Sequence, residues 1–202
     1  MTFNRFVAAR SWLAQPMDYY YSTLHFVVTP AVMIWLFVRR SHVYRGARTV
    51  LVTTTLLALL GFYLYPTAPP RLLPQFHYVD TLLEFHTWGS LANPEIAKHS
   101  NQFAAMPSLH IAWALWCGIA IWVCAQRYWV RILGLMYPLG TLVVIVGTAN
   151  HFILDAVGGA FVLALAFGVQ WTLSGHGAYV APVDAPDFGL PDPELPLHIG
   201  GE

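Results

Sequence analysis

The sequence is poor in charged residues. Only 10% of its 202 residues are charged, with ten acidic and ten basic side chains and no formal net charge, whereas soluble domains carry about 25%. The zero net charge gives no basic surface for nucleic acid, which excludes that partner class. Because 57% of the residues are hydrophobic and the mean hydropathy is +0.54, we expect an integral membrane protein.

Cysteines and metal-binding spacings are also scarce. The only cysteines, Cys117 and Cys124, lie seven residues apart in one apolar stretch. One helix would separate them by about 10 Å of rise, too far for a disulfide, so they are expected to be packing residues. No HExxH or CxxC spacing occurs, and we therefore predict neither a metal site nor a cofactor.

Long apolar stretches are abundant. A membrane-spanning helix needs about 20 mostly apolar residues, and five stretches meet this need: 19–38, 48–65, 108–125, 130–149 and 153–173. The predicted fold class is an all-α integral membrane bundle of about five transmembrane helices. The expected division has three parts: an N-terminal interfacial or flexible segment (1–18), a membrane catalytic domain (19–175), and a disordered acidic, Pro-rich tail (176–202).

Two of the connections are rich in arginine. Residues 39–48 contain four arginines and residues 126–131 contain two, so the positive-inside rule places both in the cytoplasm. Arg5 and Arg10 would then lie outside, against the rule. The long connection 66–107, in which 79–88 reads as an interfacial amphipathic helix, lies on the opposite face. We expect a cell-membrane protein whose site opens on that extracytoplasmic face.

Five polar residues gather at the helix ends on that opposite face, namely Arg71, Ser108, His110, His151 and Asp155. Ionisable groups at the edge of membrane helices indicate a functional site. His151 and Asp155 are four residues apart, so the carboxylate can orient the imidazole and leave its second nitrogen available for attack. The alternative is that Asp155 only caps its own helix and His151 is interfacial.

The other three residues suit a phosphate. Ser108 can donate its hydroxyl to a phosphoryl oxygen and His110 can protonate a leaving oxygen, although plain helix capping by Ser108 is an equal interpretation. Arg71, held by prolines, can bind a phosphate bidentately, but a lone arginine at a helix end commonly contacts headgroups. His25 is expected to form hydrogen bonds inside the bundle.

These strings resemble the three motifs of the type-2 phosphatidic acid phosphatase superfamily. They are Tyr65–Arg71, Pro107–His110 and His151–Asp155, in the family's order. The resemblance implies a six-helix core, here shortened, in which His151 attacks phosphorus to form a phosphohistidine and Asp155 orients it. It also implies that His110 protonates the leaving group, that Arg71 and Ser108 hold the phosphoryl oxygens, and that no metal is required.

The chain departs from the fuller phosphatase pattern at four positions. Leu64 stands where that pattern has a lysine, Leu72 where it has a proline, and Val144 and Ile145 where it has Ser-Arg. Two cations expected around a phosphomonoester dianion are therefore missing, and a singly charged phosphodiester needs less compensation. In this respect the chain is more similar to the branch of inositol phosphorylceramide synthase and the sphingomyelin synthases, whose acceptor is an alcohol.

The predicted function is a metal-independent lipid phosphatase or phospho-headgroup transferase, with a lipid phosphate and water or an alcohol as reactants. Two alternatives stay open. One is an intramembrane serine hydrolase that uses Ser108, His151 and Asp155, although no Gly-x-Ser-x-Gly elbow is present. The other is a non-catalytic lipid-binding or channel bundle. The sequence does not indicate the oligomeric state.

Overall fold

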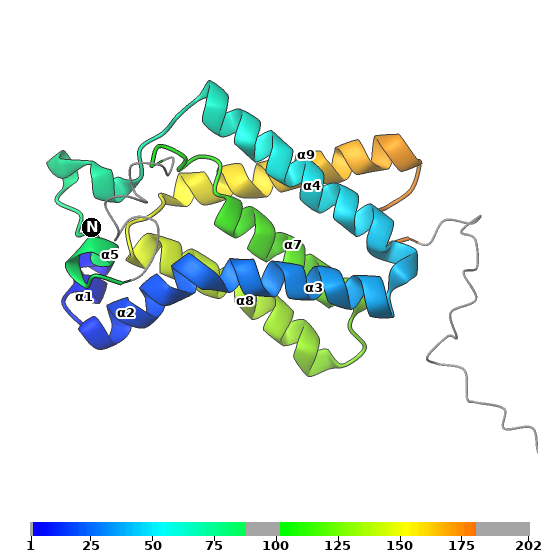
Figure 1. The fold of residues 1–202 in the computed structure, drawn as a ribbon, viewed down its shortest axis with the longest axis horizontal. Helices are drawn as coiled ribbons and strands as arrows, with labels where there is room; N and C mark the ends of the chain where they lie inside the picture. Colours follow the sequence, from blue (N-terminus) through cyan, green and yellow to red (C-terminus); the bar gives the residue numbers. More distant parts are fainter. Residues whose placement is uncertain (1, 88–101, 181–202) are drawn as a thin grey trace, which may run out of the picture.

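A computed structural model describes residues 2–87 and 102–180, and this part of the chain contains helices but no strands (Figure 1). The all-α prediction is confirmed. In chain order the helices are α1 (Thr2–Ala8), α2 (Ser11–Tyr19), a π-helical turn (Tyr20–Leu24), α3 (His25–Arg39), α4 (Ser41–Leu64), two short 3₁₀ turns (Pro70–Leu72 and Pro74–Phe76), α5 (Thr81–Glu84), α7 (Leu109–Cys124), α8 (Tyr128–Gly147) and α9 (Ile153–Ser174).

Four helical segments are long and apolar enough to cross a membrane: Ser11–Arg39, Ser41–Leu64, Tyr128–Gly147 and Ile153–Ser174. The fifth apolar helix, α7, has 16 residues and a length of about 24 Å, below the roughly 30 Å of a hydrocarbon core. Large apolar side chains face outward along these helices, for example Ile34 and Phe161, which are 64% and 63% exposed. A transmembrane helical bundle with five apolar helices is therefore confirmed.

Some boundaries differ from the predicted ones. The first span begins at Ser11 because α2 continues through the π-helical turn into α3, and α4 begins at Ser41. The predicted interfacial helix over 79–88 is a single turn, α5. Of the predicted tail, residues 176–180 are described and Ala178 is buried against Gly46 of α4. Residues 181–202 and 88–101 lie outside the described residues.

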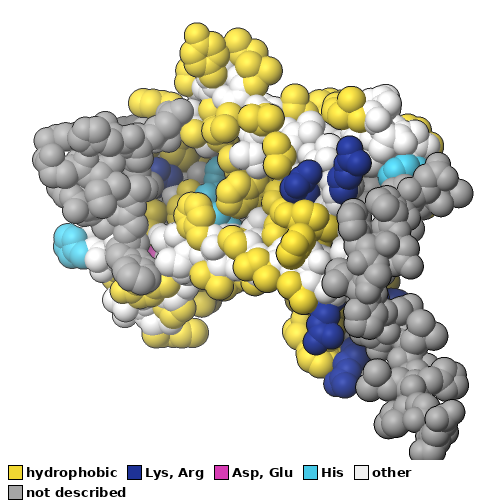
Figure 2. Space-filling view, turned by 45° about the vertical axis from the view of Figure 1, so that its right-hand side comes forward, with side chains coloured by type: hydrophobic (Ala, Val, Ile, Leu, Met, Phe, Trp, Pro, Cys, Tyr) yellow, Lys and Arg dark blue, Asp and Glu magenta, His cyan; other side chains and the backbone are white. Residues whose placement is uncertain are grey.

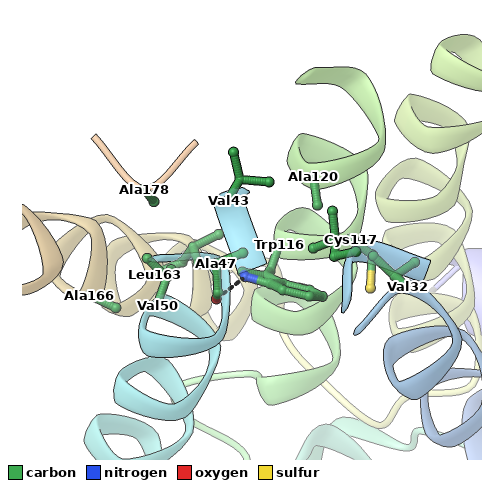
Figure 3. Close-up of a cluster of buried hydrophobic side chains, with 11 residues drawn as sticks. Val32, Val43, Ala47, Val50, Trp116, Cys117, Ala120, Leu163, Ala166 and Ala178 are labelled. Carbon is green, nitrogen blue, oxygen red and sulfur yellow. Dashed lines mark hydrogen bonds between the residues drawn. The ribbon is translucent and has the colours of Figure 1, made fainter. Parts of the chain in front are cut away.

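Helix α7 occupies the middle of the bundle and contacts α3, α4, α8 and α9 (Figure 1). The indole of Trp116 is fully buried and donates a 3.0 Å hydrogen bond to the carbonyl oxygen of Ala47 in α4 (Figure 3). Helix α7 also packs closely against α8: a Cβ atom placed on Gly118 of α7 would lie only 2.8 Å from the carbonyl oxygen of Gly134 in α8. Small residues allow such contact between membrane helices, and α7 is thereby fixed on several sides.

The two ends of the bundle differ in chemistry. At one end lie the turns that join α3 to α4 and α7 to α8, and most of the Lys and Arg side chains visible in Figure 2 lie toward the right-hand side of that view. At the other end α1, α2 and α5 gather beside the segments that lead into α7 and α9 (Figure 1). All five predicted site residues belong to this second end.

Candidate functional site

Arg71 lies against the turn that precedes His151. It follows Pro69 and Pro70 in a 3₁₀ turn, and its backbone N–H donates to the carbonyl oxygen of Ala149 at 3.0 Å. Its Nη1 donates to Asn150 Oδ1 at 2.6 Å, and its Nε lies 3.2 Å from Asp80 Oδ2. The side chain is 4% exposed. These contacts hold the guanidinium in one orientation, and neither of the two side-chain contacts uses Nη2.

A short pairing between two loops positions the backbone beside His151. Thr67 N–H donates to Phe103 O at 2.7 Å, and Ala105 N–H donates to Thr67 O at 3.2 Å. The Thr67 hydroxyl oxygen also accepts from Met106 N–H at 2.7 Å. Because three hydrogen bonds join these segments, the carbonyl group of Ala105 has a fixed direction toward the site.

His151 is 4% exposed and its two ring nitrogens have different surroundings. Nδ1 lies 2.9 Å from the Ala105 carbonyl oxygen and 3.5 Å from Asp155 Oδ2. Both neighbours are acceptors, so Nδ1 carries the proton and Nε2 keeps its lone pair. Among the described residues, Nε2 is buried and has no hydrogen-bond partner. The ring therefore presents an unpaired base to the interior of the site.

Asp155 combines the two roles that the sequence left open. Its Oδ2 accepts from the Phe152 backbone N–H at 2.8 Å, which caps α9, and the same oxygen faces His151. The shorter contact of His151 Nδ1 is to Ala105, which the spacing of His151 and Asp155 did not reveal. Asp155 thus fixes the start of α9 and adds negative charge beside the imidazole.

Ser108 joins the first turns of α7 and α9. Its side chain is fully buried, its Oγ accepts from the Ile111 N–H at 3.5 Å, and its own N–H donates to the Asp155 carbonyl oxygen at 2.9 Å. Accepting a hydrogen bond leaves the hydroxyl hydrogen available as a donor. Ser108 therefore caps α7, and its hydroxyl hydrogen remains available to donate a further hydrogen bond.

His110 lies within a group of aromatic rings. Its centroid is 5.5 Å from that of His151, 4.3 Å from Tyr21 in a stacked arrangement, and 4.4 Å from His25 at an edge-on angle of 71°. The structure thus brings together the two histidines that the sequence separated by 41 positions. It also places Tyr21 beside both histidines and His25 beside His110, and neither Tyr21 nor His25 was predicted to belong to the site.

Asp80 and Asn150 are further site residues that sequence reasoning missed. Both touch Arg71, and Asp80 also caps α5 by accepting from the Leu83 N–H at 3.3 Å. Burial raises the pKa of the Asp80 carboxyl above its ordinary value, against the opposing effect of Arg71. Because Asn150 directly precedes His151 in the chain, its membership of the site could have been predicted from the sequence. No local sequence pattern indicated Asp80.

The N-terminal helices brace the site from outside. The Asn4 side chain donates to Gly147 O at 2.9 Å and to Val79 O at 3.1 Å, and it accepts from Val79 N–H at 2.9 Å. Buried Asp18 accepts from the hydroxyl groups of Thr81 and Thr87 at 2.6 and 3.3 Å. These bonds hold residues 79–87, and with them Asp80, against the end of α8.

Fold and site together define a helical membrane protein with a histidine-containing polar cluster at one end of its bundle. The family model described as the PAP2 superfamily matches residues 1–169, which include all five predicted site residues. The chain belongs to the PAP2 superfamily. Members of this superfamily are generally phosphatases and phosphotransferases, which supports an enzyme that acts on phosphate groups of lipids. No curated protein and no solved structure matches the chain.

Proposed function

We propose that the protein is a membrane-embedded lipid phosphotransferase or phosphatase that works through a phosphohistidine, similar to inositol phosphorylceramide synthase. One observation carries the proposal: His151 Nε2 is buried and unpartnered among the described residues, while Nδ1 faces the acceptors Ala105 and Asp155. A nucleophile needs an available lone pair and an oriented ring. His151 meets both conditions, and its ring centroid lies 5.5 Å from that of a second imidazole, His110.

The proposed reaction has two steps, transfer of the phosphoryl group to His151 and its transfer onward to water or an alcohol. In the first, the Nε2 lone pair of His151 forms the P–N bond, the bond from phosphorus to the leaving oxygen breaks, and His110 gives that oxygen a proton. In the second, water or an alcohol attacks phosphorus, the P–N bond breaks, and His110 takes the proton of the attacking oxygen. Asp155 and the Ala105 carbonyl oxygen stabilise the positive charge that develops on the His151 ring.

Phosphoryl oxygens are held at the junction of Arg71 and the first turn of α7. Arg71 supplies a buried positive charge whose direction Asn150 and Asp80 fix, and Ser108 supplies its hydroxyl hydrogen. Because α7 and α9 both begin at this junction, the positive ends of their dipoles favour an anion there. This arrangement stabilises negative charge without a metal ion.

The substrate class is a phosphodiester headgroup. Val144 and Ile145, which replace Ser-Arg of the fuller pattern, are 6% and 0% exposed and belong to apolar clusters. Leu64 replaces the lysine and is 67% exposed at the end of α4. With apolar residues at these positions, the site suits the single charge of a phosphodiester better than the double charge of a phosphomonoester.

The active site opens on the extracytoplasmic face of the cell membrane. The arginines of residues 39–48 and 126–131 lie in the α3–α4 and α7–α8 connections and in the first turns of α4 and α8, at the opposite end of the bundle, and such residues stay in the cytoplasm. The site end carries fewer arginines, with Arg5 in α1 and Arg10 at the N-cap of α2 beside it.

The test is turnover by the purified protein in lipid vesicles. Phosphatidylinositol and phosphatidic acid, a diester and a monoester, are supplied with and without a lipid alcohol as acceptor. We expect turnover that is lost with His151→Ala, is retained with His42→Ala, an exposed histidine at the opposite end, and is faster for the diester. Trapped ³²P on His151 supports the intermediate, and undiminished turnover by His151→Ala would overturn the assignment.

A further inference from the structure

Tyr21 lies in the π-helical turn (Tyr20–Leu24) that joins α2 to α3. Such turns are rare in proteins and frequently occur at functional sites. The Tyr21 ring stacks on the imidazole of His110, with 4.3 Å between the centroids and 20° between the planes, and its centroid lies 6.3 Å from that of His151. Tyr21 is therefore beside both imidazoles of the proposed reaction, although none of the three sequence motifs includes it.

The two consecutive tyrosines of this turn have different surroundings. The Tyr20 hydroxyl lies 2.9 Å from Thr141 Oγ1, so it is hydrogen-bonded to α8. Among the described residues, the Tyr21 hydroxyl forms no such bond, and the phenol interacts electrostatically with Arg71 and Asp80. The hydroxyl hydrogen of Tyr21 is therefore available to a ligand of the arginine that is proposed to hold the phosphate.

Tyr21 also packs at the two positions where the chain lacks an expected cation. It contacts the apolar clusters to which Val144 and Ile145 belong, and it lines one narrow space together with these two residues and His110. In the fuller phosphatase pattern, the positions of Val144 and Ile145 hold Ser-Arg. The aromatic ring of Tyr21 thus covers the position from which that arginine would extend.

The charges near Tyr21 suit an anion with a single negative charge. Arg71 Nε lies 3.2 Å from Asp80 Oδ2, so part of the positive charge of the guanidinium is already compensated. The phenol of Tyr21 can donate a hydrogen bond but adds no charge. The second negative charge of a phosphomonoester would therefore stay uncompensated in a buried place, where an unpaired charge is costly.

From these observations we propose that the Tyr21 hydroxyl donates a hydrogen bond to a phosphoryl oxygen of the substrate and makes the site selective for a phosphodiester. This inference rests on the proposed function for the chemical class of the ligand. The neutral phenol stands in the place of the missing arginine, so it stabilises a monoanion beside His151 and His110 without compensating a dianion. Tyr21 is thereby a specificity-determining residue.

The first test removes the hydroxyl and keeps the ring. Tyr21→Phe is compared with Tyr20→Phe, which removes a hydroxyl from the same π-helical turn. Turnover of phosphatidylinositol is measured with purified protein in vesicles that contain a lipid alcohol. We expect Tyr21→Phe to lower kcat/KM about tenfold or more, because a hydrogen bond to a charged group is lost. Tyr20→Phe should lower Tm, through loss of the bond to Thr141, and leave kcat/KM near that of the unsubstituted protein.

The second test places a charge at the same position. Tyr21→Lys and Tyr21→Met have side chains of similar length and both lose the aromatic ring, so they differ mainly in charge. Within each variant, kcat/KM for phosphatidylinositol is divided by kcat/KM for phosphatidic acid, and this ratio cancels a general loss of activity. We expect a ratio about tenfold or more lower in Tyr21→Lys, because the ammonium compensates the second charge of the monoester. Equal ratios would contradict the selectivity.

A binding measurement separates this proposal from the proposed function. The affinity of the His151→Ala protein for dihexanoyl phosphatidylinositol is measured in detergent by isothermal titration calorimetry, with and without Tyr21→Phe. A fall of about fivefold or more with Tyr21→Phe supports the phenol contact. If the unsubstituted protein then shows no turnover, only the proposed function fails. Unchanged affinity together with unchanged kcat/KM in Tyr21→Phe overturns the role of Tyr21, even where turnover depends on His151.

Discussion

Arg71 Nε lies 3.2 Å from Asp80 Oδ2, and the two side chains are only 4% and 13% exposed. Removal of one member of a buried ion pair leaves the other charge uncompensated, at a cost of about 3–5 kcal/mol. We expect Asp80→Ala to lower the free energy of unfolding by an amount near this range and to raise KM, because Arg71 loses its orientation. Thermal unfolding in detergent measures the first effect. Glu84→Ala, at an exposed position on α5, is the control.

The same pair predicts a pH dependence. Because burial raises the pKa of Asp80, the folded protein holds this proton more tightly than the unfolded chain does. Its contribution to stability is therefore full below the unfolded pKa of about 3.9 and is lost as pH rises through the folded pKa. The Tm of the unsubstituted protein minus that of Asp80→Asn should fall as pH rises over this window. A difference that grows with pH would contradict the raised pKa.

His25 is expected to position His110. Since the two rings meet edge-on at 4.4 Å, His25→Ala leaves His110 with more rotational freedom. A general acid supplies about 10²–10⁴ in rate, and we expect a fall in kcat of about tenfold with KM changed little. His25→Phe keeps a ring against His110 and should recover most of the rate. An unchanged kcat in His25→Ala would show that the contact has no catalytic consequence.

Ser108 separates the proposed mechanism from a serine hydrolase. Its Oγ caps α7 by accepting from Ile111 N–H, and loss of a cap costs about 1 kcal/mol. We expect Ser108→Ala to reduce Tm slightly and to weaken turnover of lipid phosphate without abolishing it. Complete loss of activity in a folded Ser108→Ala protein, together with labelling of Ser108 by a fluorophosphonate, would favour the hydrolase.

Gly159 allows α9 to approach the beginning of α7. A Cβ atom at this position would collide with the Ser108 carbonyl oxygen, whereas one on Gly168, nine residues further along the same helix, meets nothing within 4 Å. We expect Gly159→Ala to destabilise the protein by about 1–3 kcal/mol. Gly168→Ala should be neutral or stabilising by up to about 1 kcal/mol, as alanine favours helix. Thermal unfolding of both variants checks the opposite signs.

The sequence predicted the elements whose signals are local. Apolar runs identified the membrane helices, and the position of Arg71, Ser108 and His151 beside those runs placed them at one end of the bundle. The start of the first span was wrong because Pro16 and Asp18 dilute the hydrophobicity of α2. Asp18 is buried there through bonds to Thr81 and Thr87, 63 and 69 positions away, and no local pattern reveals such partners.

The missed site residues have the same explanation. His25 reaches His110 only because α3 packs on α7, and Asp80 reaches Arg71 only because the N-terminal helices hold its loop. The His151–Asp155 spacing correctly brought these two residues together, yet the closer acceptor for His151 Nδ1 is a backbone carbonyl. Backbone partners depend on loop conformation and carry no residue signature.

The bonds of Asn4 set an order for biosynthesis. This side chain binds Val79 and Gly147, which follow it by 75 and 143 positions. At about 5–20 residues per second, roughly 7–30 s pass between synthesis of Asn4 and of its second partner. During this interval Asn4 lacks its hydrogen bond to Gly147. Helix α1 therefore completes its native contacts only after the end of α8 has been synthesised.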